Sequence, residues 1–229
     1  MNKEIINNFN DKGCTFLKNV FNSDKINDLN NEINNFMNEN NIYIHLNKRQ
    51  DVQENNFYVN NSYTTLNNYQ KIQHYYLPVI DNRKGYNRVT DSGMIDIYNA
   101  NKLFPNILIY FDLNLILTLL NKITGHKCKL LRTNIQLCNN VVNTNSFHFD
   151  NLDKCIKFTI YLSDIENNNY GPPVFIEKTH RDKKNIKTDD IKTFLGNKGD
   201  VLISLQNGFH RKLPQSNTIS GFLVFNFTY

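Results

Sequence analysis

Residues 146–162 of the chain read SFHFDNLDKCIKFTIYL, and the second half of this stretch has the pattern of a strand. Cys155–Leu162 is a short run rich in β-branched and aromatic residues, and it follows polar residues that favour a turn. Four further runs of this kind occur in the same half of the chain: Lys129–Cys138, Val174–Glu177, Asp200–Leu205 and Gly221–Tyr229. Short strands at such spacing are typical of an all-β sandwich or barrel. The sequence therefore predicts a mainly β core over residues 126–229.

The first part of the chain, residues 1–125, is predicted to be helical and irregular. Ile5, Ile6 and Phe9 give one apolar face of a first helix. Apolar residues recur at helical spacing again after Ser23, which is the expected N-cap, and over residues 112–124. Gly13 and Gly125 are expected to end the first and last of these helices. A short strand is predicted at Cys14–Leu17, and only weak strand signals occur at Ile42–Leu46 and Asn56–Val59. We expect both parts to form one domain over residues 1–229, with the helices packed outside the β core.

Composition excludes several classes of protein. No apolar run approaches the roughly 18 residues of a membrane span, and the first residues, MNKEIINNFNDKG, lack the apolar segment of a secretory leader. Four scattered cysteines without a CxxC pair argue against a zinc finger or a disulfide framework. The net charge of +5 does not form a basic stripe with interleaved aromatic residues, so a nucleic-acid partner is not expected. We expect a cytoplasmic protein without a membrane partner.

His148 and Asp150 form an HxD triplet just before the strand predicted at Cys155–Leu162. In extended backbone, residues two apart point to the same face, so the imidazole and the carboxylate are expected to lie together. His210, after the strand predicted at Asp200–Leu205, offers a third ligand. Two histidines and one carboxylate on one face of a metal are the facial triad of non-haem Fe(II) oxygenases. With six histidines and 15 aspartates in the chain, about 0.4 HxD triplets are expected by chance. Alone, the triplet would therefore favour a structural or surface role.

Four ordered segments resemble the phytanoyl-CoA dioxygenase-like family of Fe(II)/2-oxoglutarate oxygenases. They are FNDKGCTFLKNVFNSDKINDL (9–29), SFHFD (146–150), GPPVFIEKTHR (171–181) and KGDVLISLQNGFHRKLP (198–214). The resemblance implies a double-stranded β-helix, that is a cupin-like jelly-roll. It also implies that His148, Asp150 and His210 hold Fe(II), with 2-oxoglutarate as co-substrate and O2 as oxidant. His180, on the third segment, is expected to be structural.

One departure from the family concerns the co-substrate. The family usually places an Arg about ten residues after the last histidine, where it holds the distal carboxylate of 2-oxoglutarate. Residues 217–223, NTISGFL, contain no basic residue. We expect Lys212 to replace it, because it would share the inward face of His210 if the strand continues.

Three residues of the strand before the HxD triplet are further candidates for binding the co-substrate: Asn134, Gln136 and Arg132. A solvent-facing surface is the alternative for all three. Arg211 is expected to point outward. Lys157 is opposite in parity to Ile156, Phe158 and Ile160, which are expected to line the interior.

The resemblance implies hydroxylation of an unactivated C–H of a small-molecule substrate, with release of succinate and CO2. The basic segment 178–198 and residues 43–100 are expected to flank the barrel mouth. The positive charges of that segment make an anionic substrate one possibility. Arg83, Tyr58, Tyr63, Tyr75 and Tyr76 are candidate lining residues. Two alternatives stay open: a degenerate, non-catalytic jelly-roll binding protein, and an oxygenase acting on a nucleic acid or protein.

Overall fold

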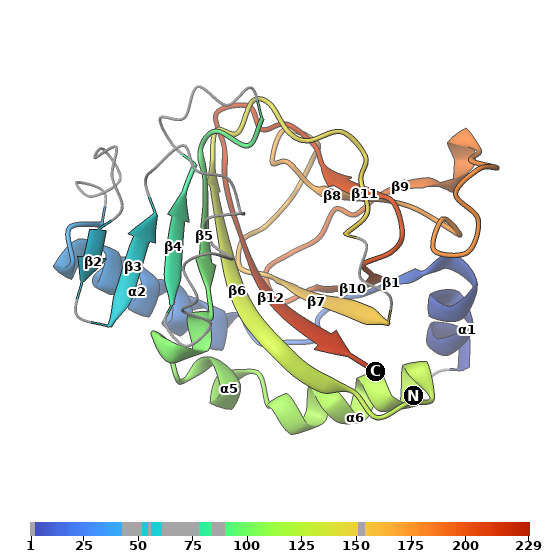
Figure 1. Cartoon of the computed structure of the whole chain (residues 1–229), viewed down its shortest axis with the longest axis horizontal. Coiled ribbons are helices and arrows are strands. Elements are labelled where there is room, and N and C mark those ends of the chain that lie inside the picture. The colour runs from blue at the N-terminus through green and yellow to red at the C-terminus, as the bar shows by residue number, and fades with distance from the viewer. Residues whose placement is uncertain (1–2, 43–51, 55, 61–77, 84–89, 151–153) are drawn as a thin grey trace.

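The computed structural model describes residues 3–42, 52–54, 56–60, 78–83, 90–150 and 154–229. Two sheets face each other across the molecule (Figure 1). The nine-stranded sheet has the order β1-β10-β7-β12-β6-β5-β4-β3-β2, and the three-stranded sheet has the order β11-β8-β9. The strands are β1 (Cys14–Leu17), β2 (Val52–Glu54), β3 (Phe57–Asn60), β4 (Val79–Asn82), β5 (Met94–Tyr98), β6 (Lys129–Asn139), β7 (Cys155–Tyr161), β8 (Pro173–Ile176), β9 (Ile191–Thr193), β10 (Val201–Leu205), β11 (His210–Lys212) and β12 (Ile219–Thr228).

The strand order is that of a jelly-roll, and the predicted fold class is confirmed. Every strand pair is antiparallel except β3 with β4. An isolated antiparallel bridge between His148 and His210 extends the small sheet by one short pairing. Because the two sheets are joined by connections that cross from one to the other, the inner faces of both enclose a common space.

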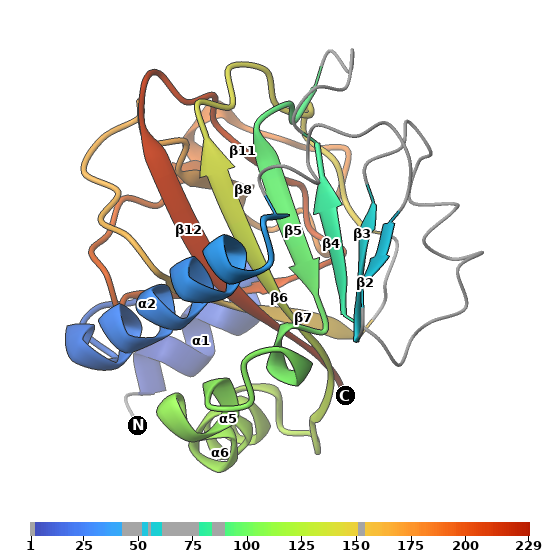
Figure 2. The same cartoon turned by 90° about the vertical axis from the view of Figure 1, so that its left-hand side faces the viewer.

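Helices cover the outer face of the large sheet, as Figure 2 shows. They are α1 (Lys3–Lys12), α2 (Ser23–Glu39), α5 (Ile107–Tyr110) and α6 (Leu113–Thr124), with single 3-10 turns at Ala100–Lys102 and Thr188–Asp190. Among the described helices, none is long and apolar enough to cross a membrane. The predicted ends of α1 and α6 are confirmed, since Gly13 and Gly125 both adopt positive φ. The predicted N-cap of α2 was one residue late, because it is the side chain of Asn22 that accepts a hydrogen bond from Asp24 N at 2.8 Å.

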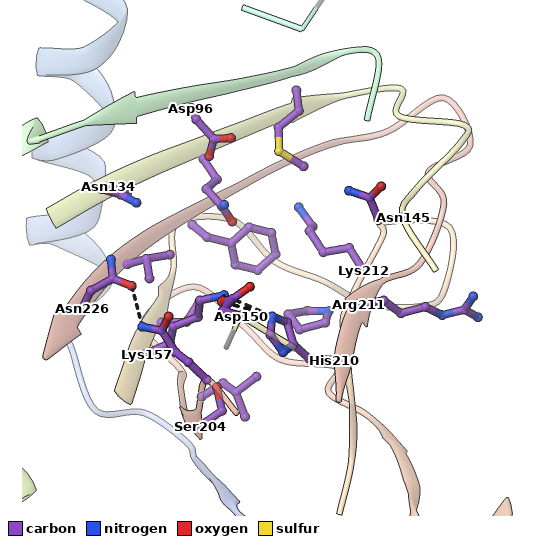
Figure 3. A pocket seen from close by; sticks show the side chains of 18 of the residues that line it. Asp96, Asn134, Asn145, Asp150, Lys157, Ser204, His210, Arg211, Lys212 and Asn226 are labelled. Carbon is purple, nitrogen blue, oxygen red and sulfur yellow. Dashed lines mark hydrogen bonds and ion pairs between the residues drawn. The ribbon is translucent and has the colours of Figure 1, made fainter. Parts of the chain in front are cut away.

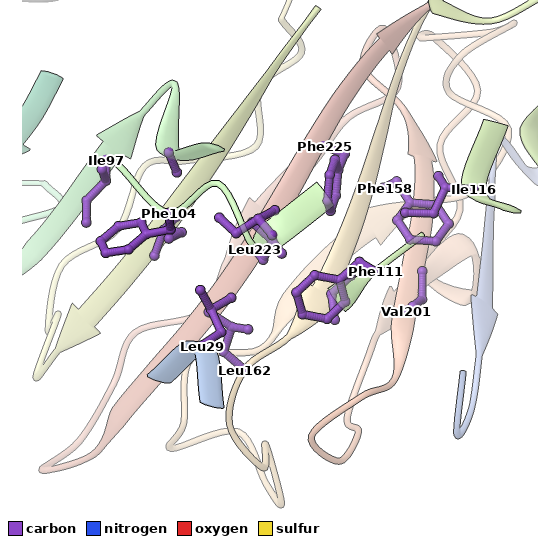
Figure 4. Close-up of a cluster of buried hydrophobic side chains, with 14 of the residues drawn as sticks. Leu29, Ile97, Phe104, Phe111, Ile116, Phe158, Leu162, Val201, Leu223 and Phe225 are labelled. Atoms are coloured by element: carbon purple, nitrogen blue, oxygen red, sulfur yellow. The ribbon is translucent and has the colours of Figure 1, made fainter. Parts of the chain in front are cut away.

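The main hydrophobic core lies between these helices and the large sheet (Figure 4). Leu29 of α2 and Phe111, after α5, pack against side chains from β7 and β12, among them Phe158 and Phe225. Ile156, Phe158 and Ile160 belong to this core and are fully buried. The prediction that these three residues line the barrel interior was therefore wrong. The helices provide the apolar partner surface, so the alternate residues of β7 face the space between the sheets.

The first 125 residues contribute more strands than the sequence indicated. Five of the nine strands of the large sheet, β1 to β5, come from this part, although only β1 and part of β3 had a sequence signal. β4 and β5 contain Asp81, Asn82 and Asp96, which interrupt the apolar pattern expected of a strand. Asp96 lines the internal cavity, so its strand is polar on the cavity side. The weak strand signal at Ile42–Leu46 lies, after Ile42, outside the described residues.

Candidate metal centre and its cavity

The structure brings His148, Asp150 and His210 together at one end of the space between the sheets. One ligand atom from each residue lies within 4.8 Å of the other two. The bridge between the two histidines is closed by backbone hydrogen bonds of 3.1 and 2.9 Å, and the ring centroids are 4.7 Å apart. Asp150 is fixed by its backbone N–H, which donates to Gln206 O at 2.9 Å. The backbone bridge thus joins histidines that are about sixty positions apart in the sequence.

Both imidazoles present the same nitrogen to the centre of the triad. Nδ1 of His148 lies 2.9 Å from Ser146 O, and Nδ1 of His210 lies 2.9 Å from Gly208 O. Each Nδ1–H therefore donates to a backbone carbonyl, so Nε2 is the nitrogen of each ring that carries the lone pair a metal would use. Burial, and next the charge of Lys157, lower the pKa of His210 to about 4. The ring is neutral at physiological pH, as a metal ligand must be.

The loop before His210 is held by Thr179, one of the residues that carried the family resemblance. Its hydroxyl donates to Ile176 O at 2.6 Å and accepts from Phe209 N at 2.8 Å. Phe209 N–H is thus tied to the end of β8, directly before the ligand. Of the described residues, His180 is not part of the metal cluster. It packs against Gly13, where an added Cβ would meet its ring at 2.4 Å, in accordance with a structural role.

Lys157, which was expected to point outward, lies inside the triad. Its Nζ is 2.5 Å from Asp150 Oδ2 and 3.1 Å from His210 Nε2 (Figure 3). The ammonium group therefore contacts ligand atoms of two of the three residues that a metal would use. Burial opposes ionisation of Asp150, but the positive charge of Lys157 beside it lowers the pKa of the carboxyl below its usual value. The error in the prediction follows from the inverted faces of β7.

A cavity of about 610 Å³ extends from the triad between the two sheets. Its wall on the large sheet consists of cross-strand rows. The first row is Arg132, Asn226, Lys157 and Ser204, in register on β6, β12, β7 and β10. The next is Asn134, Val224, Thr159 and Leu202, and the third joins Gln136 to Phe222. Arg132, Asn134 and Gln136 thus share the cavity side of β6 rather than a solvent-facing surface.

Lys212 lines the cavity beside the triad. It is on β11, two residues beyond His210, with its side chain directed into the cavity (Figure 3). Arg211, which was expected to point outward, also contributes to the lining, and its guanidinium group lies 4.7 Å from the centroid of the Phe147 ring. The Nζ of Lys212 lies 4.3 Å from the centroid of the Phe222 ring and 2.8 Å from Cys138 Sγ. Within the described part of the chain it makes no ion pair with a carboxylate. Phe222 is the inward residue at the start of β12, close to the point at which the family usually carries its Arg.

A second charged group lines the cavity at the edge formed by β4 and β5. Arg83, one of the expected lining residues, makes ion pairs with Asp81, Asp91 and Asp96 at 3.4, 3.2 and 2.6 Å. These carboxylates raise the pKa of Arg83 above its usual range, against the effect of burial. Asn145 also donates to Asp91, which ties the loop before the HxD triplet to this edge. Tyr58 lies on β3, and the other expected lining residues, Tyr63, Tyr75 and Tyr76, lie outside the described residues.

Sequence reasoning missed Lys157, Asn226 and Asp96 as cavity residues. The alternation on β7 contained a signal, because Lys157 and Thr159 alternate with the apolar residues that the helices cover; on β12 only Asn226 interrupts the apolar run 222–227. The wrong assumption was that the apolar face of a barrel strand must face inward.

No family model and no curated protein sequence matches the chain. Solved structures do match it. The non-heme α-ketoglutarate-dependent epimerase SnoN from nogalamycin biosynthesis is 9% identical, with a TM-score of 0.65 over 99% of this chain and 81% of that chain. HygX from Streptomyces hygroscopicus, solved with nickel, 2-oxoglutarate and hygromycin B, is 10% identical, with a TM-score of 0.61 over 100% and 87%. EctD from S. alaskensis, solved with bound Fe, is 10% identical, with a TM-score of 0.67 over 100% and 76%. At these identities the likeness establishes the fold: the chain has the jelly-roll architecture of these non-haem iron enzymes.

Proposed function

We propose that the protein is an Fe(II)/2-oxoglutarate-dependent dioxygenase that hydroxylates an unactivated C–H of a small molecule. The observation that carries this proposal is the convergence of His148, Asp150 and His210, with both Nε2 atoms directed to the centre. The donor set fits Fe(II), because two neutral imidazoles and one carboxylate leave further coordination positions for a co-substrate and O2. Membership in the phytanoyl-CoA dioxygenase-like family, and the organisation of residues 1–229 as one oxygenase domain, are part of the same proposal.

The fold of the solved neighbours supports the choice of metal and co-substrate. HygX was solved with 2-oxoglutarate and EctD with iron, and SnoN is described as α-ketoglutarate-dependent. When bound, Fe(II) and 2-oxoglutarate would supply the oxidising chemistry, with succinate and CO2 as by-products. The protein would hold the metal on two histidines joined by a backbone bridge at the edge of the small sheet, which fixes their positions relative to each other.

We assign the distal carboxylate of 2-oxoglutarate to Lys212. Its ammonium group lies in the cavity beside Phe222, and its contacts are the Cys138 sulfur and an aromatic ring. A half-buried ammonium without a carboxylate partner favours a bound anion, because burial of an unpaired charge is costly. Gln136 and Asn134 line the wall that the large sheet contributes to the same cavity and would hydrogen-bond the co-substrate, while Arg132 is the other basic candidate.

The test is a titration of 2-oxoglutarate into anaerobic, Fe(II)-loaded protein, followed by the visible charge-transfer band of the chelated co-substrate. We expect a saturable band in the wild type and none in His148→Ala. Stoichiometric Fe(II) binding without a band at millimolar 2-oxoglutarate would contradict the proposal and favour a non-catalytic binding protein. Failure to bind Fe(II) would mean that the protein shares only its fold with the solved non-haem iron enzymes.

A small-molecule substrate is supported by the volume of the cavity, about 610 Å³, and by the hygromycin B bound in the HygX structure. A concave site of this size between two sheets is typical of sites that bind small molecules. Steep salt dependence of binding to a polyanion would instead indicate a nucleic-acid substrate.

A further inference from the structure

The first row of the cavity wall contains hydrogen-bond donors beside the metal triad. Arg132 and Asn226 are cross-strand partners on β6 and β12, and Asn226 and Lys157 are partners on β12 and β7. Neighbouring strands lie about 4.8 Å apart, so the backbones of Arg132 and Lys157, which flank Asn226, are about 10 Å apart. Arg132, Asn226 and Lys157 all line the cavity, and we call these three residues the donor row.

Asn226 is buried, with 2% of its surface exposed, and its amide is only half satisfied. Its Oδ1 accepts a hydrogen bond from Gln206 Nε2 at 3.1 Å (Figure 3). Its Nδ2 has no hydrogen-bond partner within the described structure. A buried amide N–H without an acceptor is rare and costs about 1–3 kcal/mol. The free donor of Asn226 therefore points to an acceptor that the protein itself does not provide.

The charges of the donor row are also uncompensated once the triad holds its metal. Arg132 makes no ion pair within the described residues, and its guanidinium group lies over the Tyr98 ring at 5.7 Å. Lys157 now pairs with Asp150 and contacts His210, but these are the residues assigned to the metal. A divalent cation there would compete with the ammonium group for the same atoms and repel it. Two positive charges and one free amide donor would then face the cavity together.

We propose that the donor row binds an acidic group of the substrate, a carboxylate, phosphate or sulfate, and so orients the substrate next to the metal. This inference rests on the proposed function and extends it to the chemical class of the substrate. The donor row is distinct from the co-substrate anchor, because Lys212 lies two rows away, next to Phe222. Gln206 links the metal triad to the donor row. Its backbone carbonyl accepts a hydrogen bond from Asp150 N–H, and its side-chain amide donates to Asn226 Oδ1.

Inorganic sulfate is a suitable probe, because it has the charge of the expected group and binds Fe(II) weakly. Anaerobic protein loaded with Fe(II) and 2-oxoglutarate is dialysed to equilibrium against labelled sulfate at constant ionic strength, while the charge-transfer band is recorded. We expect one sulfate per chain, with the band retained. Arg132→Gln and Lys157→Met should each weaken sulfate binding by about tenfold or more, as expected for loss of a charge-assisted hydrogen bond.

Two further variants separate a specific site from a general effect of charge or folding. Lys129→Gln removes one positive charge from the exposed end of the same strand and should leave sulfate affinity unchanged. Asn226→Asp keeps the shape of the side chain but replaces the free donor with a negative charge, so it should abolish sulfate binding. Circular dichroism confirms that each variant is folded before it is compared.

Three results would overturn the inference: no saturable sulfate binding in the wild type, equal affinity in Arg132→Gln and Lys129→Gln, or displacement of 2-oxoglutarate by sulfate. The last would assign the donor row to the co-substrate. The proposed function is judged separately by the band recorded before sulfate is added. If that band is absent, sulfate binding that depends on Arg132 still establishes the anion site, while its absence removes both.

Discussion

The two faces of β7 differ sharply in what they contact, although their residues alternate along a single strand. Ile156, Phe158 and Ile160 lie against the helices and are fully buried in the main core. Lys157 and Thr159 face the opposite way, and Lys157 reaches the metal triad. The comparison shows that residues that stabilise the fold and residues that line the site alternate along the same strand. On β7 the face covered by helices is apolar, and the cavity face carries Lys157 and Thr159.

The largest expected effect is on the helix side of β7. Phe158→Ala should lower the free energy of unfolding by about 3–5 kcal/mol, because it leaves a cavity in a core that cannot collapse fully. Thr159→Ala, one residue away on the cavity side, should cost less than about 1 kcal/mol. Urea denaturation of both variants measures the difference. Equal losses would mean that the two faces contribute alike and that the comparison fails.

Among the cavity-lining residues, Arg83 is expected to be required for the stability of the fold. Arg83→Met should destabilise the fold by about 3 kcal/mol, because it leaves Asp81, Asp91 and Asp96 together and buried without their cation. The measurement is again urea denaturation, with exposed Lys192→Met as the control for loss of one charge. A cost below 0.5 kcal/mol, on the order of that of a surface substitution, would contradict the assignment of this group as a structural support of the cavity.

A smaller energetic effect, on binding rather than on folding, is expected at Lys212. Lys212→Met should weaken 2-oxoglutarate by about 10–100-fold, the loss expected for a hydrogen bond to a charged group, and leave Fe(II) affinity unchanged. Titration of the charge-transfer band measures the first quantity and calorimetry with Fe(II) the second. If 2-oxoglutarate affinity is unchanged in Lys212→Met but lost in Arg132→Gln, the anchor is Arg132.

The smallest effect is the absence of a reaction. Burial, and next the charge of Glu177, raise the pKa of Cys14 to about 12. At pH 8 its thiolate fraction is about one in ten thousand, so iodoacetamide should not label Cys14 in the native protein. Mass spectrometry after labelling, with urea-unfolded protein as the control, tests this. The raised pKa stabilises the fold below pH 9, and that contribution decreases as the pH rises further. Rapid native labelling would show that β1 is not packed as described.

Much of the fold was predictable because its signals are local. The runs that became β6, β7, β8, β10 and β12 are β-branched and aromatic, and the helix that became α6 ends at Gly125 as its sequence indicates. The strands β4 and β5 were not predictable, because Asp81 and Asp96 break their apolar pattern. These carboxylates are explained only by Arg83, which pairs with both in the folded chain.

The sequence by itself determined which residues could hold a metal, because ligand chemistry belongs to side-chain types and the HxD spacing is short. It also determined that residues 217–223 contain no basic residue. The tertiary structure alone decided which face of each strand is the inside, since that depends on where the helices pack. For this reason Lys157 and Asn226 face the cavity. Lys212, at the end of β11, lies next to Phe222, near the start of β12. Local patterns fix the elements, whereas burial of the larger apolar surface fixes their orientation.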